Sequence, residues 1–433
     1  MKRQIRLGST LEMWLTPGIG VKRWMIVLLL GIVLLAWSAA CALLLVAGAE
    51  IQSFVASGWL GIIAALLAGV GLIMLALVKF AHNILAPYRT HQQKPVIDVV
   101  YSHSRRQKGL KVVAIGGGTG LPAVLKGLKA YTSNLTAVVT VADDGGSSGR
   151  LRRDLGVLPP GDLRNNIAAL ADDENLMTQL FQHRFQNGDL GGHAFGNLFI
   201  SALSAVTGSL ETALIETERV LNISGRVLPA TLEDVNLSAD VRLDGARRLT
   251  TITGESNITA AGGKIEELSL VPADVGAYQG SVQAILDADM VIIGPGSLYT
   301  SILPNLLVKG IADALRATRA RKVYVCNIAM QPGETSEFSV ADHVMALEKY
   351  IGRGVLQVVL SNSATPSANV ETRYVPPVPE QHEIMQRYTV LHTDLVDAER
   401  PWRHDPNKLV AAILSLHGAE RTGNAAALPV VQA

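Results

Sequence analysis

The stretch "VVAIGGGTGLPAVL", Val112 to Leu125, decides the fold that the sequence predicts. A short apolar run ends in glycines, and apolar residues at helical spacing follow them. Glycines let the backbone turn sharply and bring its N–H groups close to a ligand, and a helix N-terminus favours an anion. The stretch therefore predicts a strand, a phosphate-compatible turn and a helix. We call the turn the glycine loop: Gly116, Gly117, Gly118, Thr119 and Gly120.

The glycine loop departs from the two best-known phosphate-binding motifs. A Walker A loop has Lys followed by Ser or Thr after its last glycine, and here Leu121 and Pro122 stand there. A dinucleotide fingerprint has Gly or Ala at position 121. The loop suits a phosphate group without identifying an NTPase or an NAD enzyme. A tight turn that binds no ligand is the alternative.

From Leu110 onward, short apolar runs alternate with helical patterns. The strand candidates are "LKVVAI", "NLTAVVTVA", "ADMVIIG", "KVYVCN" and "VLQVVLS". This alternation predicts an α/β fold with a Rossmann-like, doubly wound and mostly parallel sheet. Three further extended segments, "RVLPAT", "VNLSADVRL" and "KIEELSLV", are expected to form an insert or a small antiparallel subdomain.

The stretch "TVADDGGSSGRLRR", Thr140 to Arg153, follows the second predicted strand. The carboxyl ends of the strands in such a sheet line one crevice, so this stretch should face the glycine loop. Its two aspartates suit contact with a ribose or base, retention of Mg²⁺, or general base catalysis. Composition alone favours an exposed flexible loop, whereas the position at a strand end favours a ligand site. The candidate residues are Asp143, Asp144, Gly145, Gly146, Ser147, Ser148 and Arg150, with Asp143 and Asp144 as the candidate metal ligands.

The stretch "LPPGDLRNNIAALAD" begins a predicted helix after Pro159, Pro160 and Gly161. Asp162 is expected to cap that helix. The polar side chains of its first turn either reach the crevice, where an amide can recognise the edge of a base, or face solvent. These candidates are Arg164, Asn165 and Asn166.

Two more stretches add candidate contacts. In "GGHAFGNLF", Asn197 stands near the start of an apolar helix and needs a hydrogen-bond partner, whereas His193 is expected to be structural. "VIIGPGSLYT" repeats the order strand, glycine, helix. Gly294, Gly296 and Ser297 there form a second corner suited to an anion, with Ser297 as an N-cap.

Two uncharged runs near the N-terminus predict a helical hairpin that crosses a membrane: Trp24–Ala49 and Gly58–Val78. Only Glu50 carries charge between them, while basic residues flank both outer ends. The pattern places both ends, and therefore the main domain, on the cytoplasmic side of the cell inner membrane. A cleaved signal peptide and a buried soluble hairpin are the alternatives. The first run is long for a signal peptide, and neither run has a polar face.

The remaining composition limits other functions. The net charge is +1, which gives no indication of nucleic-acid binding. Two distant cysteines, Cys41 and Cys326, form neither a disulfide framework nor a zinc pattern. The predicted organisation is a cytoplasmic segment (1–23), two membrane helices (24–80), a basic linker (81–109), a nucleotide-binding domain (110–400), and a C-terminal helix with a disordered tail (401–433).

Six stretches together resemble one family: "AIGGGTGLPAVLKGLK", "TVADDGGSSGRLRRDLGVLPPGDLRNNIAALAD", "HAFGNLFISAL", "LPATLEDVNLSADV", "ADMVIIGPGSLYTSILPNLLVKGI" and "VYVCNIAMQPGET". They are similar to the bacterial gluconeogenesis factors, which belong to the wider superfamily of the 2-phospho-L-lactate transferase of coenzyme F420 synthesis. The likeness covers roughly Leu110 to Arg400.

The resemblance implies a function as well as a fold. It implies a regulator of cell shape and of growth on gluconeogenic carbon sources that binds a UDP-sugar such as UDP-N-acetylglucosamine. The expected partners are the membrane, cell-wall synthesis proteins and further copies of the chain. The alternative is a transferase that uses Mg²⁺ and a nucleotide-linked donor, for which Asp143 and Asp144 would be the first residues to test. The continuous "DDGGSSGRLR" is closer to the gluconeogenesis-factor branch.

Overall fold

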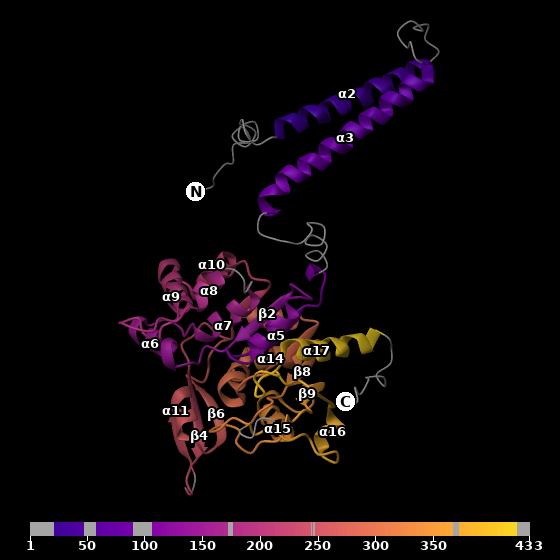
Figure 1. The fold of residues 1–433 in the computed structure, drawn as a ribbon. Helices are drawn as coiled ribbons and strands as arrows, with labels where there is room; N and C mark the ends of the chain where they lie inside the picture. Colours follow the sequence, from indigo (N-terminus) through magenta and orange to yellow (C-terminus); the bar gives the residue numbers. More distant parts are fainter. Residues whose placement is uncertain are drawn as a thin grey trace. The chain divides into compact units, whose positions relative to one another are not determined.

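In the computed structural model of the chain, the described residues are 21–46, 58–89, 106–171, 176–243, 245, 247–366 and 372–421. They belong to two compact units, Met1–Ser102 and His103–Ala433, which are treated separately below (Figure 1). Residues 1–20 of the predicted cytoplasmic segment (1–23), residues 90–105 of the predicted basic linker (81–109) and residues 422–433 at the C-terminus lie outside the described residues.

The N-terminal unit is a pair of helices, α2 (Val21–Val46) and α3 (Gly58–Arg89). Gly31 and Gly69 face each other, and a Cβ on either would lie 3.0 Å from the other's carbonyl oxygen. The Ser38 hydroxyl donates a hydrogen bond to the Ile62 carbonyl (2.9 Å). Small residues of this kind let two helix backbones approach closely without a soluble core between them.

By length and composition both helices can cross a membrane. The windows Ile26–Leu43 and Gly61–Lys79 each have a mean hydropathy of 2.7, and only 17% of each window is buried. A signal sequence and a core helix of a soluble protein meet the same length and composition criteria, although a core helix is mostly buried. Large apolar side chains such as Leu30, Leu67 and Met74 point away from the pair.

The larger unit is built on a seven-stranded sheet with the order β10-β9-β8-β7-β1-β2-β3. All six neighbouring pairs are parallel. The chain runs outward from β1 to β2 and β3, and later returns to β7 on the other side of β1. This confirms the predicted α/β, doubly wound fold. The strands are β1 (Val112–Gly116), β2 (Leu135–Val139), β3 (Arg226–Pro229), β7 (Met290–Ile293), β8 (Arg321–Val325), β9 (Val358–Asn362) and β10 (Thr389–Thr393).

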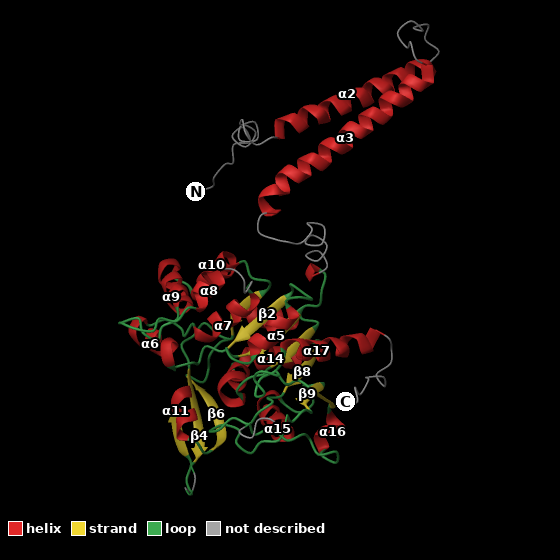
Figure 2. Ribbon diagram, viewed as in Figure 1, coloured by secondary structure: helices red, strands yellow, loops and turns green. Residues whose placement is uncertain are grey.

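Helices surround the sheet (Figure 2). Contacts join α5, α7 and α17 into one group and α12, α13, α14 and α15 into another. The first group and its neighbours are α5 (Leu121–Leu128), α6 (Gly146–Leu155), α7 (Gly161–Leu170), α8 (Leu176–Gln182), α9 (Phe195–Thr207), α10 (Leu210–Leu221) and α17 (Pro406–Arg421). The others are α12 (Gln279–Leu286), η1 (Leu298–Ile302), α13 (Leu303–Leu307), α14 (Lys309–Ala317), α15 (Val340–Ile351) and α16 (Glu383–Arg387).

A second, antiparallel sheet has the order β5-β4-β6 and carries one short helix beside it (Figures 1 and 2). It confirms the predicted small antiparallel subdomain for two of the three extended segments. The third, "RVLPAT", was predicted wrongly, because β3 pairs in parallel with β2 in the central sheet. Its residues Arg226–Pro229 follow α10 and form an edge strand of that sheet. The elements are β4 (Asn236–Arg242), β5 (Thr250–Thr253), α11 (Glu255–Ala261) and β6 (Lys264–Val271).

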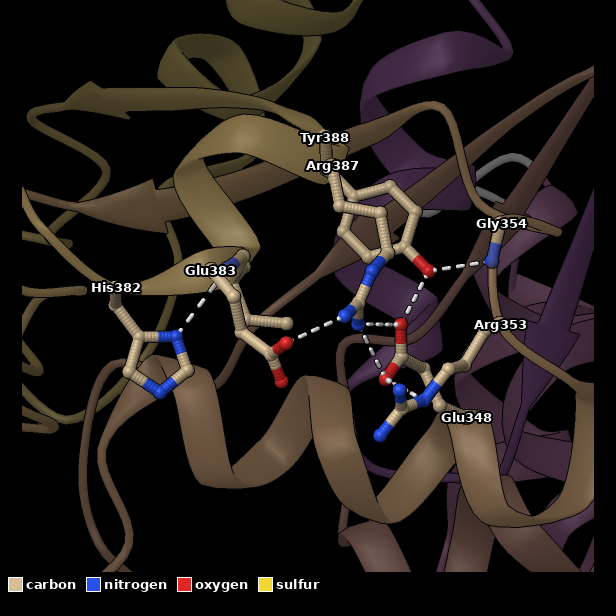
Figure 3. A network of polar contacts seen from close by, with 8 residues as sticks. Glu348, Arg353, Gly354, His382, Glu383, Arg387 and Tyr388 are labelled. Carbon is tan, nitrogen blue, oxygen red and sulfur yellow. Dashed lines mark hydrogen bonds and ion pairs between the residues drawn. The ribbon is translucent and has the colours of Figure 1, made fainter.

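A polar network fastens α15 to α16 near the amino ends of β9 and β10 (Figure 3). The buried Glu348 carboxylate accepts bonds from Arg387 (2.6 and 2.8 Å) and from the Tyr388 hydroxyl (2.5 Å). The Tyr388 oxygen in turn accepts the Gly354 amide (2.8 Å). A buried carboxylate requires such partners, so the network is a structural clamp far from the carboxyl ends of the strands.

The compact unit continues beyond Arg400. Helix α17 packs on α5 and buries Leu409, Val410, Ile413 and Leu416. The two helices approach so closely that a Cβ on Gly127 would overlap Val410. The C-terminal helix is therefore part of the same hydrophobic core as the sheet.

Candidate functional site

The glycine loop is held from two sides by buried asparagines. Asn305, on α13, donates to the Gly116 carbonyl (3.0 Å), and Asn166, on α7, donates to the Gly117 carbonyl (3.1 Å). Both side chains are completely buried. The loop is thus a rigid turn whose shape is fixed by helices distant in the sequence.

A cavity of about 660 Å³ opens where the glycine loop meets the loops after β7 and β8. The strand order reverses between β1 and β7, because β2 and β3 lie on one side of β1 and β7 to β10 lie on the other. In doubly wound folds, ligands bind in the crevice at such a switch point. Gly120 lies so close to the β7 loop that a Cβ there would overlap the Pro295 carbonyl. Of the residues predicted as ligand contacts, Thr119, Gly120, Gly296 and Ser297 line the cavity.

Side-chain amides tie the β7 and β8 loops together beside the cavity. Asn327 accepts the Gly296 amide (3.1 Å) and donates to Gln331 (3.0 Å), and Gln331 donates to the Ser297 hydroxyl (2.7 Å). Ser297 stands at the N-cap position of η1, as predicted, but its side chain makes no cap hydrogen bond. Its hydroxyl instead accepts the hydrogen bond from Gln331 that joins the two loops.

One side of the cavity is basic and aromatic, and the sequence analysis missed it. Lys126 comes from α5, and Arg400, Trp402 and Arg403 come from the segment before α17. Arg400 pairs with Asp397 (3.3 Å), and the Trp402 side chain is half exposed. Lys126 lies within a predicted helix, and the other three lie at or beyond the predicted domain boundary at Arg400, so no strand-end argument indicated them.

Two acidic residues also line the cavity, Glu255 on α11 and Glu334 in the loop after β8. Thr300 donates to Glu334 (3.0 Å), and the second carboxylate oxygen of Glu334 has no partner among the described residues. Burial raises the pKa of both carboxyl groups. The pKa of Glu255 reaches about 9, because Asp143, Asp162, Asp144 and Glu334 add negative charge around it.

The stretch around Asp143 is only partly the open loop that the sequence suggested. Helix α6 begins at Gly146, so Ser147 and Ser148 occupy its first turn, and the left-handed Gly156 ends it. Asp143 accepts the Gly145 amide (2.9 Å), and Asp144 accepts the Ser256 amide at the start of α11 (2.9 Å). The two aspartates hold backbone turns, with half-buried side chains that do not line the cavity.

Asp162 has a different role from the predicted cap. The N-cap of α7 is Pro160, and the Asp162 carboxylate accepts the Gly118 amide of the glycine loop. Burial and the nearby Asp143 raise its pKa to about 7. The residue as a whole is half-buried, whereas its carboxyl group is enclosed by protein groups.

The other predicted contacts do not line the cavity, and several of them bond to one another or to nearby backbone. Ser147 bonds to the His193 ring (3.0 Å) and accepts from Asn197 (3.0 Å), while Ser148 accepts the Gly161 amide (3.1 Å). Arg150 donates to the Gly191 carbonyl (2.8 Å), and Arg164 donates to Asn165 (2.5 Å). The predicted residues that do not line the cavity are Gly116, Gly117, Gly118, Asp143, Asp144, Gly145, Gly146, Ser147, Ser148, Arg150, Arg164, Asn165, Asn166, Asn197 and Gly294.

The described residues do not fit a protein-held Mg²⁺ ion. In that part of the chain no three His, Cys, Asp or Glu side chains converge as metal ligands. Asp143 and Asp144 each use one oxygen on a backbone amide, and Asp162 does so as well. Magnesium prefers several free oxygens in an octahedral arrangement.

Comparison with known proteins places this geometry in a family. Residues 112–398 match the family model described as "2-phospho-L-lactate transferase CofD". The chain belongs to the bacterial gluconeogenesis-factor family, within the 2-phospho-L-lactate transferase superfamily. This confirms the resemblance drawn from the motifs.

Three relatives illustrate the extent of the match. A gluconeogenesis factor of Bacillus subtilis is 47% identical and spans 61% of this chain and 82% of its own length. A candidate gluconeogenesis factor of Nostoc sp. is 43% identical and spans 95% of this chain and 93% of its own. The crystal structure of a UPF0052-family protein of Bacillus halodurans is 42% identical, with a TM-score of 0.66 over 71% of this chain and 99% of that one.

Proposed function

We propose that this gluconeogenesis factor binds a nucleotide-sugar, such as UDP-N-acetylglucosamine, and thereby regulates cell shape during gluconeogenic growth. The cavity at the switch point between β1 and β7 carries this proposal. Its volume of about 660 Å³ falls within the range of small-molecule sites. Its lining supplies groups for each part of such a ligand.

The diphosphate would lie at the N-terminus of α5. The amides of the glycine loop and the helix dipole favour an anion there. Lys126 and Arg403 line the same cavity and add positive charge. Trp402, which is half exposed at the rim, offers a flat apolar surface on which a base or a sugar ring can stack.

Calorimetry on the full chain in detergent micelles tests this proposal, with UDP-N-acetylglucosamine as the titrant. We expect saturable binding that weakens about tenfold in Lys126→Met, equivalent to about 1.4 kcal/mol. Lys309→Met is the matched control, because Lys309 begins α14 and does not line the cavity. No heat at millimolar ligand with folded protein would refute nucleotide-sugar binding.

We also propose that the two N-terminal helices anchor the protein in the cell inner membrane with the larger unit in the cytoplasm. Membrane attachment would bring the binding unit close to lipid-linked wall precursors. Cell-wall synthesis proteins and a second copy of the chain are the partners proposed from the resemblance. Pull-down with and without UDP-N-acetylglucosamine would show whether the ligand changes such contacts.

A second candidate is a transferase that moves a phosphorylated group from a nucleotide-linked donor. The match to the transferase family model favours it. It ranks below ligand binding because the described carboxylates do not fit a resident Mg²⁺ ion. Turnover of a deazaflavin acceptor with an authentic donor and added Mg²⁺ would support it, and a silent assay with folded protein would reject it.

A further inference from the structure

The amino ends of the central strands carry a group of basic residues. Neighbouring strands are parallel, so these ends share one edge of the sheet, and the cavity lies at the opposite edge, where the strands end. The segment before β1 and the start of β8 bring exposed or half-buried basic side chains to the amino ends. We call these five residues the basic edge: Arg106, Lys108, Lys111, Arg319 and Arg321.

Backbone hydrogen bonds bring the basic edge together. The Asp289 amide donates to the Lys111 carbonyl (2.9 Å), and the Arg321 amide donates to the Asp289 carbonyl (3.1 Å). Neighbouring strands lie about 4.8 Å apart, so the backbones of Lys111 and Arg321, two strands apart, are separated by about 10 Å. The Asn134 side chain, just before β2, donates to the carbonyls on either side of Lys108 (both 2.8 Å). The basic edge therefore extends across β8, β7, β1 and β2.

Positive charge exceeds negative charge along this edge. Lys108, Lys111 and Arg319 form no ion pair with any residue that the structure describes. The acidic side chains beside them are Asp287 and Asp289, both just before β7. The Asp289 carboxylate accepts the Lys111 amide (2.8 Å). An anionic surface is the partner that this distribution of charge fits.

Large apolar side chains are exposed at the same edge. Tyr131 is 56% exposed in the turn before β2, and that turn holds the entering chain, because the Ser133 amide donates to the Arg106 carbonyl (3.1 Å). Leu286, which is 42% exposed, stands shortly before β7. Tyrosine is favoured at the level of lipid headgroups, and apolar residues among basic ones are typical of proteins that lie on anionic membranes.

The chain itself connects the basic edge to the two apolar helices. Helix α3 ends at Arg89, and the chain enters the larger unit at the basic edge, through residues 106–111. Residues 90–105 span at most about 58 Å even when fully extended. Such a tether raises the effective concentration of the basic edge at a membrane that α3 crosses, so that a few basic residues suffice for contact.

We propose that the basic edge docks the larger unit on the anionic lipid surface of the membrane and leaves the cavity, at the opposite ends of the strands, uncovered. This inference rests on the proposed membrane attachment and adds the surface and the lipid chemistry that orient the unit. Lys108, Lys111 and Arg319 contact lipid phosphates, and Tyr131 lies among the headgroups. A ligand then enters and leaves the cavity while the unit stays docked.

Fluorescence quenching on the full chain in lipid nanodiscs tests this docking. In a background with Cys41 and Cys326 replaced by alanine, a fluorophore on Ala130→Cys, beside Tyr131, reports contact with lipids whose headgroups carry a nitroxide. We expect quenching about threefold stronger in discs with about a third phosphatidylglycerol than in phosphatidylcholine discs. The difference should vanish in about 1 M NaCl, where the Debye length is about 3 Å. A fluorophore on Glu337→Cys, in the loop after β8 at the opposite edge, should show no such difference.

Two double variants assign the effect to the basic edge. Lys111→Gln combined with Arg319→Gln removes two positive charges from the edge and should reduce the phosphatidylglycerol-dependent quenching about twofold or more. Lys264→Gln combined with Lys309→Gln removes the same charge from exposed residues that begin β6 and α14, and should leave the quenching unchanged. Equal loss in both would mean that net charge governs the contact, and would overturn the assignment to the basic edge.

The outcomes separate docking from membrane attachment. If the chain enters nanodiscs of neither composition, the proposed attachment fails and docking fails with it. If the chain enters the discs but quenching is the same with both lipids, or the same at both labels, docking alone is overturned. Should the cysteine-free chain not fold, hydrogen exchange of the wild-type chain decides. Docking protects residues 130–134 in phosphatidylglycerol discs and not in phosphatidylcholine discs, and equal exchange in the two would overturn the proposal.

Discussion

Gly120 is the residue at which the glycine loop touches the loop after β7. Its Cα faces the Pro295 carbonyl and the Gly296 amide, and both belong to backbone that cannot rotate away. We predict that Gly120→Ala forces the glycine loop and the β7 loop apart. The expected cost is about 1–3 kcal/mol of folding stability, together with weaker UDP-N-acetylglucosamine binding. Thermal unfolding and calorimetry measure the two effects.

Gly296→Ala is the matched control, since it adds the same methyl group across the same contact. A Cβ on Gly296 would lie 3.5 Å from Ser301, which is ordinary packing distance. Its melting temperature should stay within about 1–2 °C of wild type, the scale of a change well below 1 kcal/mol. Equal destabilisation of the two variants would mean that the crowding at Gly120 is relieved by local movement.

Glu255 makes stability depend on pH. Its pKa is raised from 4.5 to about 9 in the folded protein, by burial first and then by neighbouring carboxylates. Between these values the folded state holds a proton that the unfolded chain releases, so stability falls as pH rises from about 4.5 to about 9. Glu255→Gln cannot lose that proton. Its melting temperature should exceed that of wild type by about 4 °C or more at pH 8, and match it near pH 5.

Asp162 also contributes to the dependence of stability on pH. Its pKa is raised from 3.8 to about 7, so it contributes a loss of stability of the same sign, but over a lower pH range. Glu255→Gln should therefore retain part of the pH dependence below pH 7 and lose the part above it. Parallel curves for variant and wild type between pH 5 and pH 9 would contradict the raised pKa of Glu255.

At the scale of elements, local patterns predicted β1, β2, β7, β8 and β9, because each is a short, mostly apolar run between turns. The strand β10 was not predicted, since its side chains are partly polar and exposed or half-buried. The glycine loop and Ser297 were identified because glycines follow such strands directly. Helix α6 was missed because "GGSSGRLRR" has almost no apolar spacing. It is held by residues far along the chain, such as the His193 ring and Asn197 of α9, which both bond to Ser147.

The basic side of the cavity could not be predicted for the same reason. Lys126 and Arg403 lie almost 280 positions apart in the numbering, and only the packing of α17 on α5 brings them to one cavity. Asp162 looked like a helix cap because Asp is favoured at that place. The contact with Gly118 that determines its role depends on the fold and leaves no local signal.

Helix α17 should be essential for the stability of the larger unit. Leu409 is completely buried where α17 meets the core, so Leu409→Ala should cost about 2–5 kcal/mol and lower the melting temperature. It should also weaken ligand binding, because the segment before α17 carries Arg403. Asn407→Ala, an exposed change in the same helix, is the control. An unchanged melting temperature in Leu409→Ala would contradict the packing of α17.

At the scale of the whole molecule, one chain carries two compact units of different composition, a pair of apolar helices and the larger α/β unit. The relative from Thermotoga maritima spans 98% of its own length but only 70% of this chain, whereas the Nostoc relative spans 95%. The helical pair is thus an addition that some family members share. Its exposed apolar side chains, including Leu30 and Met74, would be unfavourable in water. A lipid environment removes that cost.

Cysteine labelling in intact cells tests this arrangement. Cys41 and Cys326 are both free thiols. The sequence has two cysteines, so replacing both with alanine gives a background without thiols. In that background, a membrane-impermeant maleimide should label Gln52→Cys, between the two helices, and leave Lys108→Cys, at the start of the larger unit, unlabelled. Detergent permeabilisation should then label both equally. The basic flanks predict this orientation, because positive charge stays on the cytoplasmic side. Labelling of Lys108→Cys before permeabilisation would reverse the orientation, and would place the cavity away from the cytoplasmic pool of nucleotide-sugars that the proposed function requires.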